Sequence, residues 1–224
     1  MDSRPENGVD SVMPSPADDH ATGRPTDEGA VRIRIERDTP EPDLVKATEA
    51  ARDLLTALGL DVTHPVLAET PRRMAKAYAE LLSPREFDLT TFPNDEGYDE
   101  LVLARRIPFH SVCEHHLLPF VGVAHVGYLP GERILGLSKL ARVVELFARR
   151  PQVQERMTKQ IADWLDTHLR PKGVGVVLEA EHMCMTLRGV QVSGTSTVTS
   201  SLLGVVRSDP RTRQEFLTLV RHAG

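Results

Sequence analysis

Residues 98–131 read YDELVLARRIPFHSVCEHHLLPFVGVAHVGYLPG, and they set the architecture of the middle of the chain. Residues 98–109 and 120–129 are rich in aliphatic and aromatic side chains, a composition typical of β-strands. Pro130-Gly131 marks a turn after the second of these segments. We therefore predict two strands, joined by a segment that contains Cys113-Glu114-His115-His116.

The segments around this pair predict helices before, between and after the strands. Gly59 ends the first helical pattern, and Thr70-Pro71 supplies an N-cap and a first-turn proline for the second. Two further stretches, 174–186 and 195–206, have strand composition. The apolar periodicity predicts helices over 44–58, 70–82, 138–149, 153–169 and 210–220. Because the predicted strands and helices do not alternate strictly along the chain, we predict an α+β fold with a mostly antiparallel sheet.

The first 40 residues are acidic, contain several prolines and hold no aromatic side chain. Such a segment cannot bury enough apolar surface to offset the entropy of ordering it. We predict a disordered tail over residues 1–40, although the alternation over 31–35 is also compatible with an edge strand. Residues 41–97 would then form a helical N-terminal part, and residues 98–224 the core.

Composition excludes several classes of protein. The chain has 27 Lys and Arg against 32 Asp and Glu, and this net charge of −5 argues against a nucleic-acid partner bound by a bulk positive field. No run approaches the roughly 18 apolar residues of a membrane span. The N-terminus lacks the apolar stretch of a secretory signal, and two cysteines cannot form a disulfide scaffold. We predict a cytoplasmic protein without a membrane or nucleic-acid partner.

Both cysteines lie among histidines. His110, His115 and His116 surround Cys113, and His182 lies beside Cys184. Thiolate and imidazole are the ligands that zinc prefers, and two Cys with one His would leave a coordination position for water, as in catalytic zinc sites. Composition does not choose between His115 and His116. A closed structural site with two Cys and two His, or two unrelated core thiols, stay open as alternatives.

The spacing around the second cysteine adds a prediction. If residues 180–188 form a strand, alternate side chains share one face, so that His182, Cys184 and Arg188 lie in a row with Thr186. Three apolar side chains would then point into the core: Met183, Met185 and Leu187. A face with an imidazole, a thiol and a guanidinium suits a metal-assisted reaction on an anion.

Two polar helix starts suggest binding groups. Residues 136–142 (GLSKLAR) place Ser138, Lys139 and Arg142 at a helix N-terminus, where phosphate binds readily. Glu155, at the start of the next helix, could accept two N–H donors from a guanine edge. Solvated bases and a first-turn carboxylate explain the same patterns, so neither is specific alone.

Five motifs occur in this order: CEHH (113–116), GLSKLAR (136–142), RPQVQER (150–156), HMC (182–184) and RGV (188–190). With these motifs, the chain from about residue 44 to 222 resembles the GTP cyclohydrolase I family. The resemblance implies the tunnelling fold and a toroidal homodecamer with active sites at subunit junctions. It implies a zinc-dependent conversion of GTP and water into 7,8-dihydroneopterin triphosphate and formate.

The resemblance also implies roles for individual residues. Zinc would be held by Cys113, His116 and Cys184. Proton transfer would fall to His115, His182 and Ser138. Glu155, with Gln154 beside it, would bind guanine. The triphosphate would be held by Ser138, Lys139, Arg142 and Arg188, with Arg73 added from a neighbouring subunit. The alternatives are a catalytically silent zinc scaffold that binds a pterin or a partner protein, and another tunnelling-fold enzyme such as a pterin synthase or a nitrile reductase.

Overall fold

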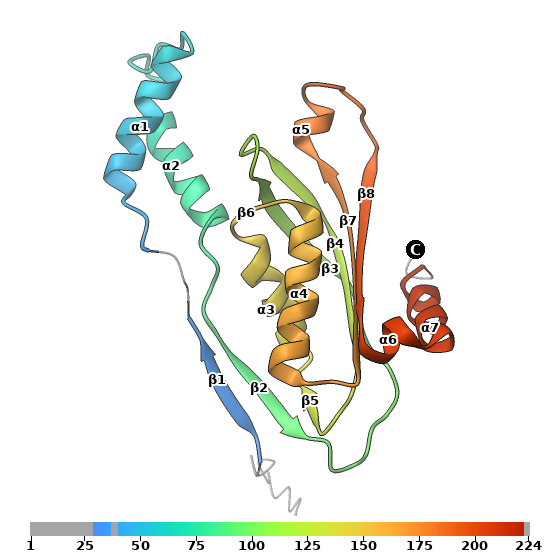
Figure 1. The fold of residues 1–224 in the computed structure, drawn as a ribbon. Coiled ribbons are helices and arrows are strands. Elements are labelled where there is room, and N and C mark those ends of the chain that lie inside the picture. Colours follow the sequence, from blue (N-terminus) through green and yellow to red (C-terminus); the bar gives the residue numbers. More distant parts are fainter. Residues whose placement is uncertain (1–28, 37–39, 222–224) are drawn as a thin grey trace, which may run out of the picture.

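The computed structural model describes residues 29–36 and 40–221, which form an α+β fold around a five-stranded sheet (Figure 1). The strand order is β6-β3-β4-β7-β8, and every neighbouring pair is antiparallel except β3 with β6. The strands are β3 (Val102–Cys113), β4 (Pro119–Leu129), β6 (Pro151–Gln152), β7 (Gly173–His182) and β8 (Ser196–Leu203). The predicted α+β fold with a mostly antiparallel sheet is confirmed.

A second, three-stranded sheet contains β1 (Val31–Ile35), β2 (Phe87–Pro93) and β5 (Arg133–Leu135). The assignment of residues 31–35 to a disordered tail is wrong. Their alternating side chains form an edge strand that pairs antiparallel with β2, and Arg34 binds Glu86 at 2.7 Å. The same prediction for residues 1–28 and 37–39 lies outside the described residues. Neither β2 nor β5 was predicted.

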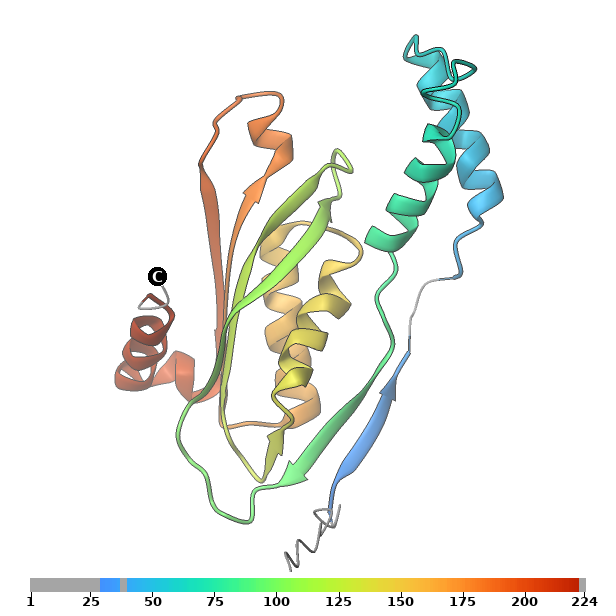
Figure 2. The ribbon, with the colours of Figure 1, turned by 180° about the vertical axis from the view of Figure 1, so that it is seen from behind.

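The first two helices, α1 (Leu44–Ala57) and α2 (Thr70–Leu81), form a hairpin that projects from the body of the fold (Figures 1 and 2). Asp43 caps α1 by accepting from the Lys46 N–H at 3.1 Å, and Gly59 follows the helix with a φ of 84°. Thr70 is already helical and Glu69 is the N-cap of α2, so the predicted cap is displaced by one residue.

Two longer helices, α3 (Ser138–Ala148) and α4 (Gln154–Leu169), cover one face of the five-stranded sheet (Figure 1). Their apolar residues recur every three or four positions, as a helix packed on one side requires. Leu140 of α3 and Ile161 of α4 are fully buried and pack in one core cluster with Phe120, Val126 and Leu178 of the sheet. Burial of each such side chain contributes about 1.5–3 kcal/mol. This core fixes the end of the sheet at which β3 and β7 finish.

The opposite face of the sheet carries α6 (Gly204–Ser208) and α7 (Pro210–Arg221). Asp209 caps α7 as predicted, accepting from the N–H and the hydroxyl of Thr212, each at 2.7 Å. Phe216 of α7 is fully buried and lies so close to Gly175 that a β-carbon there would approach its ring to 2.7 Å. None of the helices in residues 29–36 and 40–221 is long and apolar enough to span a membrane.

Two predicted strand boundaries differ from the structure. The first core strand begins at Val102 rather than at residue 98, because Tyr98 belongs to a turn in which its N–H donates to Asn94 Oδ1 at 2.9 Å. The last β-rich stretch ends at Leu203, where Gly204 adopts a φ of 56° and starts α6.

Candidate metal centre and active site

The turn between β3 and β4 places two of the predicted ligands side by side. The Cys113 N–H donates to Leu118 O at 2.9 Å, and the Leu117 N–H donates to Cys113 O at 2.8 Å. Leu117 has a φ of 52°, a left-handed conformation that non-glycine residues rarely adopt. This tight turn brings Cys113 Sγ and His116 Nδ1 within 3.8 Å of each other.

The third predicted ligand, Cys184, lies on the one-turn helix α5 (Met183–Thr186). The predicted strand over 180–188 is wrong beyond His182. His182 pairs with Phe120, and the next position on β4 is Pro119, which has no N–H to continue a ladder. The chain therefore coils, and the Leu187 N–H donates to Met183 O at 3.0 Å.

The predicted inward orientation of the apolar side chains around Cys184 is also wrong. Leu187 is 68% exposed, Met185 is 36% exposed and Met183 is half-buried. The helical turn of α5, and not strand alternation, brings Cys184 toward the turn between β3 and β4.

The ligand atoms of Cys113, His116 and Cys184 all lie within 4.8 Å of one another, so this group could hold a metal ion. No other group of three or more Cys, His, Asp or Glu side chains meets this condition in the described part of the chain. His115 does not join the group, and its side chain is 64% exposed. Burial, followed by the neighbouring Cys113 thiol, raises the pKa of Cys184 above its ordinary value.

His182 lies next to this metal group, at the end of β7. Its ring stacks on Phe120, with centroids 4.5 Å apart and an interplanar angle of 4°. Its Nε2 lies 2.7 Å from Oε1 of Gln154. Burial lowers the pKa of His182, and the charge of Glu155 opposes this effect.

Gln154 and Glu155 point in different directions although they are adjacent. Gln154 is 1% exposed, whereas Glu155 is exposed and lines a hollow of about 550 Å³ between α4 and β8. Sequence reasoning missed the contact between Gln154 and His182. The available signal was that Gln154 lies on the buried stripe of α4 with Met157 and Ile161, where a polar side chain needs an internal partner.

Sequence reasoning also missed Glu114, the second residue of the CEHH motif. It forms an ion pair with Arg156 of α4 and lies 3.9 Å from His115 Nε2. The Glu114 N–H donates to Gln152 O at 3.0 Å, so that the turn is tied to the start of α4. No local pattern reveals this pair, because Glu114 and Arg156 are 42 residues apart.

The predicted phosphate ligands of α3 lie away from the metal group. Helix α3 runs from β5 to β6, and β6 pairs with β3 at Cys113 (Figure 1). Ser138 and Lys139 are at the far end of this 11-residue helix, which is roughly 16 Å long. Arg142 is half-buried, with its Nη1 3.3 Å from Oε2 of Glu145. A single chain does not bring these side chains to the metal group.

The other two predicted phosphate ligands lie on elements that border the metal group. Arg188 follows α5, and its charge opposes the rise in the pKa of Cys184. Arg73 is exposed on α2, a helix that reaches the metal turn through the Tyr78 hydroxyl, which donates to Leu117 O at 3.2 Å.

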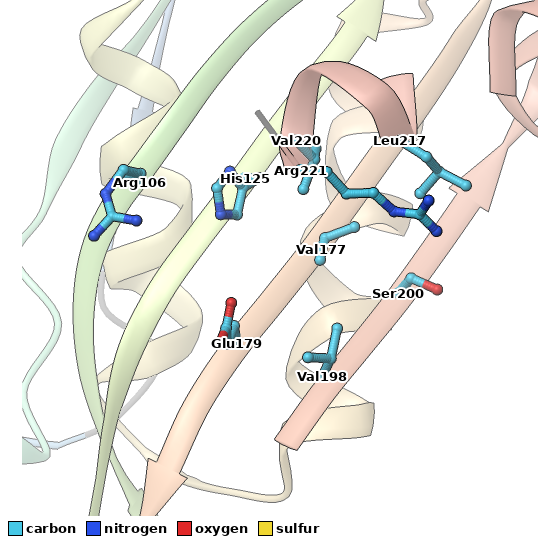
Figure 3. Close-up of a pocket in the computed structure, with 9 residues that line it drawn as sticks. All are labelled: Arg106, His125, Val177, Glu179, Val198, Ser200, Leu217, Val220 and Arg221. Carbon is cyan, nitrogen blue, oxygen red and sulfur yellow. The ribbon is translucent and has the colours of Figure 1, made fainter. Parts of the chain in front are cut away.

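A separate pocket of about 500 Å³ lies on the opposite face of the sheet, under α7 (Figure 3). His125, a polar side chain in its lining, is 4% exposed, and its Nδ1 has no hydrogen-bond partner among the described residues. The pocket is lined by Arg106, His125, Val177, Glu179, Val198, Ser200, Leu217, Val220 and Arg221. It contains none of the predicted site residues.

The structure is an α+β fold in which three side chains that could hold a metal ion lie near a half-buried histidine. A family model described as GTP cyclohydrolase I matches residues 47–221, and the chain belongs to this family.

Curated relatives agree with this assignment. The chain is 53% identical over 186 residues to GTP cyclohydrolase 1 of Synechococcus sp. (strain JA-3-3Ab), covering 81% of this chain and 80% of the relative. It is 52% identical over 179 residues to GTP cyclohydrolase 1 of Aquifex aeolicus, covering 80% and 97%. The human GTP cyclohydrolase 1 is 50% identical over 194 residues, covering 85% and 77%. The resemblance drawn from the five motifs is confirmed.

Proposed function

We propose that this chain is a zinc-dependent enzyme that converts GTP and water into 7,8-dihydroneopterin triphosphate and formate. Its family and its relatives establish a GTP cyclohydrolase. The zinc ion, the product and the residue roles are the parts that we add. The observation that carries them is the convergence of Cys113, His116 and Cys184 beside His182.

The ligand group fits zinc. Zinc bound tetrahedrally by sulfur at about 2.3 Å and nitrogen at about 2.0 Å separates its ligand atoms by about 3.5–3.8 Å. Cys113 Sγ and His116 Nδ1 are 3.8 Å apart, which agrees with this separation. Two thiols this close would repel each other as thiolates, and a divalent cation between them removes that repulsion. When bound, zinc lowers the pKa of a coordinated water to about 7 and so supplies a nucleophile at neutral pH.

The protein side chains would handle the protons of the reaction. Water would add its oxygen to C8, and His182 would protonate one of the two nitrogens bonded to C8 as the bond from C8 to that nitrogen breaks. His115, exposed beside the metal group, and Ser138 would shuttle protons while the ribose rearranges and closes onto the freed amine. A second hydrolytic step would release formate.

Separate side chains would orient GTP. The Glu155 carboxylate would accept two N–H donors from the guanine edge, since it is exposed at the N-terminus of α4 near His182. Ser138, Lys139, Arg142 and Arg188, with Arg73, would bind the triphosphate through charge-assisted hydrogen bonds.

This assignment needs more than one chain. Because Ser138 and Lys139 lie at the far end of α3 from Cys113, a complete site requires that a second copy supply these two triphosphate ligands. This geometry supports active sites at subunit junctions. We propose the tunnelling fold over residues 98–224 and the ring-shaped homodecamer that the family resemblance implies.

The test is to incubate the purified, metal-analysed protein with GTP and measure formate and the fluorescence of oxidised neopterin. We expect one zinc per chain and stoichiometric release of both products. Bound zinc without product would favour the silent scaffold, and product without zinc would refute the metal assignment.

A further inference from the structure

The side-chain amide of Gln154 can be oriented from its surroundings. Its Nε2 lies 2.9 Å from Thr197 O and 3.2 Å from Leu178 O. Both are backbone carbonyls, which only accept hydrogen bonds. The nitrogen of the amide must therefore face them, and the oxygen must face His182.

This orientation determines which nitrogen of His182 carries a proton. Gln154 Oε1 is only an acceptor, so His182 Nε2, 2.7 Å away, must donate to it. In the neutral ring the other nitrogen, Nδ1, then has the lone pair. We propose that Gln154 is a positioning residue that holds His182 in its Nε2–H tautomer, so that His182 exchanges protons with the substrate through Nδ1. The catalytic part of this proposal rests on the proposed role of His182 in proton transfer.

The surroundings also fix the plane of the ring. Phe120, which is fully buried, stacks against one face of His182 with nearly parallel planes. Rotation of the ring by 180° about its Cβ–Cγ bond would move Nε2 away from Gln154 and leave a buried amide oxygen without its donor. Such an unsatisfied polar atom costs about 1–3 kcal/mol, which favours the observed orientation.

Gln154 is itself braced from two elements. Its Nε2 also lies 3.1 Å from Thr199 Oγ1 of β8, and its backbone carbonyl accepts from the Thr158 hydroxyl at 2.7 Å. The two threonine hydroxyls are 2.6 Å apart. The donor side of the amide is therefore engaged by protein acceptors, which leaves Gln154 poorly placed to bind guanine and well placed to hold His182.

The direct test is a nitrogen NMR spectrum of the zinc-loaded, full-length protein labelled with ¹⁵N-histidine. The His182 signals are assigned by their absence in His182→Asn. We expect a protonated Nε2 and an unprotonated Nδ1 in the neutral ring. A protonated Nδ1 in the unaltered protein would overturn the proposal without any variant. Because this measurement needs no turnover, its result is separate from the test of GTP hydrolysis.

Variants connect the tautomer to catalysis. Gln154→Met has a similar volume but no acceptor, and we expect mixed tautomers with kcat reduced about 10–100-fold and KM for GTP changed less than about threefold. The matched control is Gln152→Met, because Gln152 is equally buried but bonds to Phe147 O and Gln160. It should leave the His182 spectrum unchanged.

The kinetic pattern separates positioning from substrate binding. A rise in KM with unchanged kcat and an unchanged tautomer in Gln154→Met would show that Gln154 contacts GTP, and would overturn the proposal. If Gln152→Met altered the His182 spectrum as strongly, the effect would be a general loss of packing, and the specific role of Gln154 would be rejected.

Discussion

The predicted site residues near the two ends of helix α3 differ in whether one chain brings them together with the rest of the site. At its C-terminal end, β6 lies beside the turn that bears Cys113, and the metal group and His182 come together from β3, α5 and β7. At its N-terminal end, Ser138 and Lys139 lie with Arg142, the third predicted phosphate ligand of this helix. In the proposed site, one chain would supply the metal end, and the phosphate end would serve the metal end of another chain.

The largest effect should come from breaking the metal end. We predict that Cys184→Ala loses bound zinc and lowers turnover by about 10³-fold or more, because two remaining ligands hold the ion weakly. Metal analysis and the GTP assay on the same sample check this. Met185→Leu, a change at a 36% exposed neighbour, is the control and should retain both. Stoichiometric zinc in Cys184→Ala would remove Cys184 from the ligand set.

The next prediction separates the two ends by subunit. Lys139→Ala should raise KM for GTP about 10–100-fold, since it removes a charge-assisted hydrogen bond to the triphosphate. Zinc content should stay at the wild-type level, because Lys139 lies at the far end of α3. Steady-state kinetics and metal analysis give both values. Equal loss of zinc would contradict the separation of the two ends.

Co-expression of two defective chains tests whether one site combines residues of two chains. If each site combines the metal end of one chain with the phosphate end of another, mixing Cys184→Ala with Lys139→Ala should restore about a quarter of wild-type turnover at low GTP. Half of the metal ends are intact, and half of these meet an intact phosphate end. No recovery in a mixed oligomer would place the whole site within one chain.

A smaller effect is expected at Glu155, on the surface of α4. Glu155→Gln should weaken binding of GTP about 10–30-fold, because one guanine N–H loses a charged acceptor. Binding of inorganic triphosphate should be unchanged. Calorimetric titration with both ligands measures the difference, and Asp163→Asn on the same helix is the control. Equal losses for both ligands would exclude Glu155 from the guanine site.

Sequence reasoning succeeded where the signal is local. The periodicity of α3 and α4 located both helices within one residue, and the clustering of histidines around Cys113 and Cys184 pointed to the side chains that could hold a metal ion. The choice of His116 over His115 came from the family resemblance. Both imidazoles have Nδ1 3.8 Å from Cys113 Sγ, and His116 is the one that also lies within 4.8 Å of the Cys184 thiol.

Sequence reasoning failed where a structural feature depends on a residue that is distant in the sequence. The pairing of β1 with β2 joins residues far apart in the sequence, such as Ile33 and Leu89, which are 56 positions apart, and so does not show in the local pattern. Strand β7 ends at His182 because the next position of the neighbouring strand is Pro119, which has no N–H to pair with it. Residues 183–186 form a helical turn instead. Gln154 meets His182 across 28 residues, and only packing of α4 on β7 brings them together.

The smallest predicted effect concerns His125, on the face of the sheet away from the metal group (Figure 3). Burial lowers its pKa, Arg106 and Arg105 lower it further, and Glu179 opposes them. Arg221 of α7 adds a further positive charge to the pocket lining. The neutral form is therefore favoured in the folded state more than in the unfolded chain, where a histidine has a pKa of about 6.5.

The free energy of unfolding should therefore fall as the pH falls. Above pH 6.5 the contribution of His125 is fully present; as the pH falls below 6.5, the unfolded chain binds the proton first and stability is lost. One such group contributes a slope of at most about 1.4 kcal/mol per pH unit. His125→Leu should reduce the fall in free energy of unfolding between pH 7 and pH 5, measured by urea denaturation. The difference between the two proteins at pH 8 gives the packing cost alone, so only a change in that difference at lower pH reports protonation. If the difference in free energy of unfolding between the two proteins stays constant across this range, His125 titrates alike in the folded and unfolded states. This face of the sheet would then not favour the neutral form of its histidine.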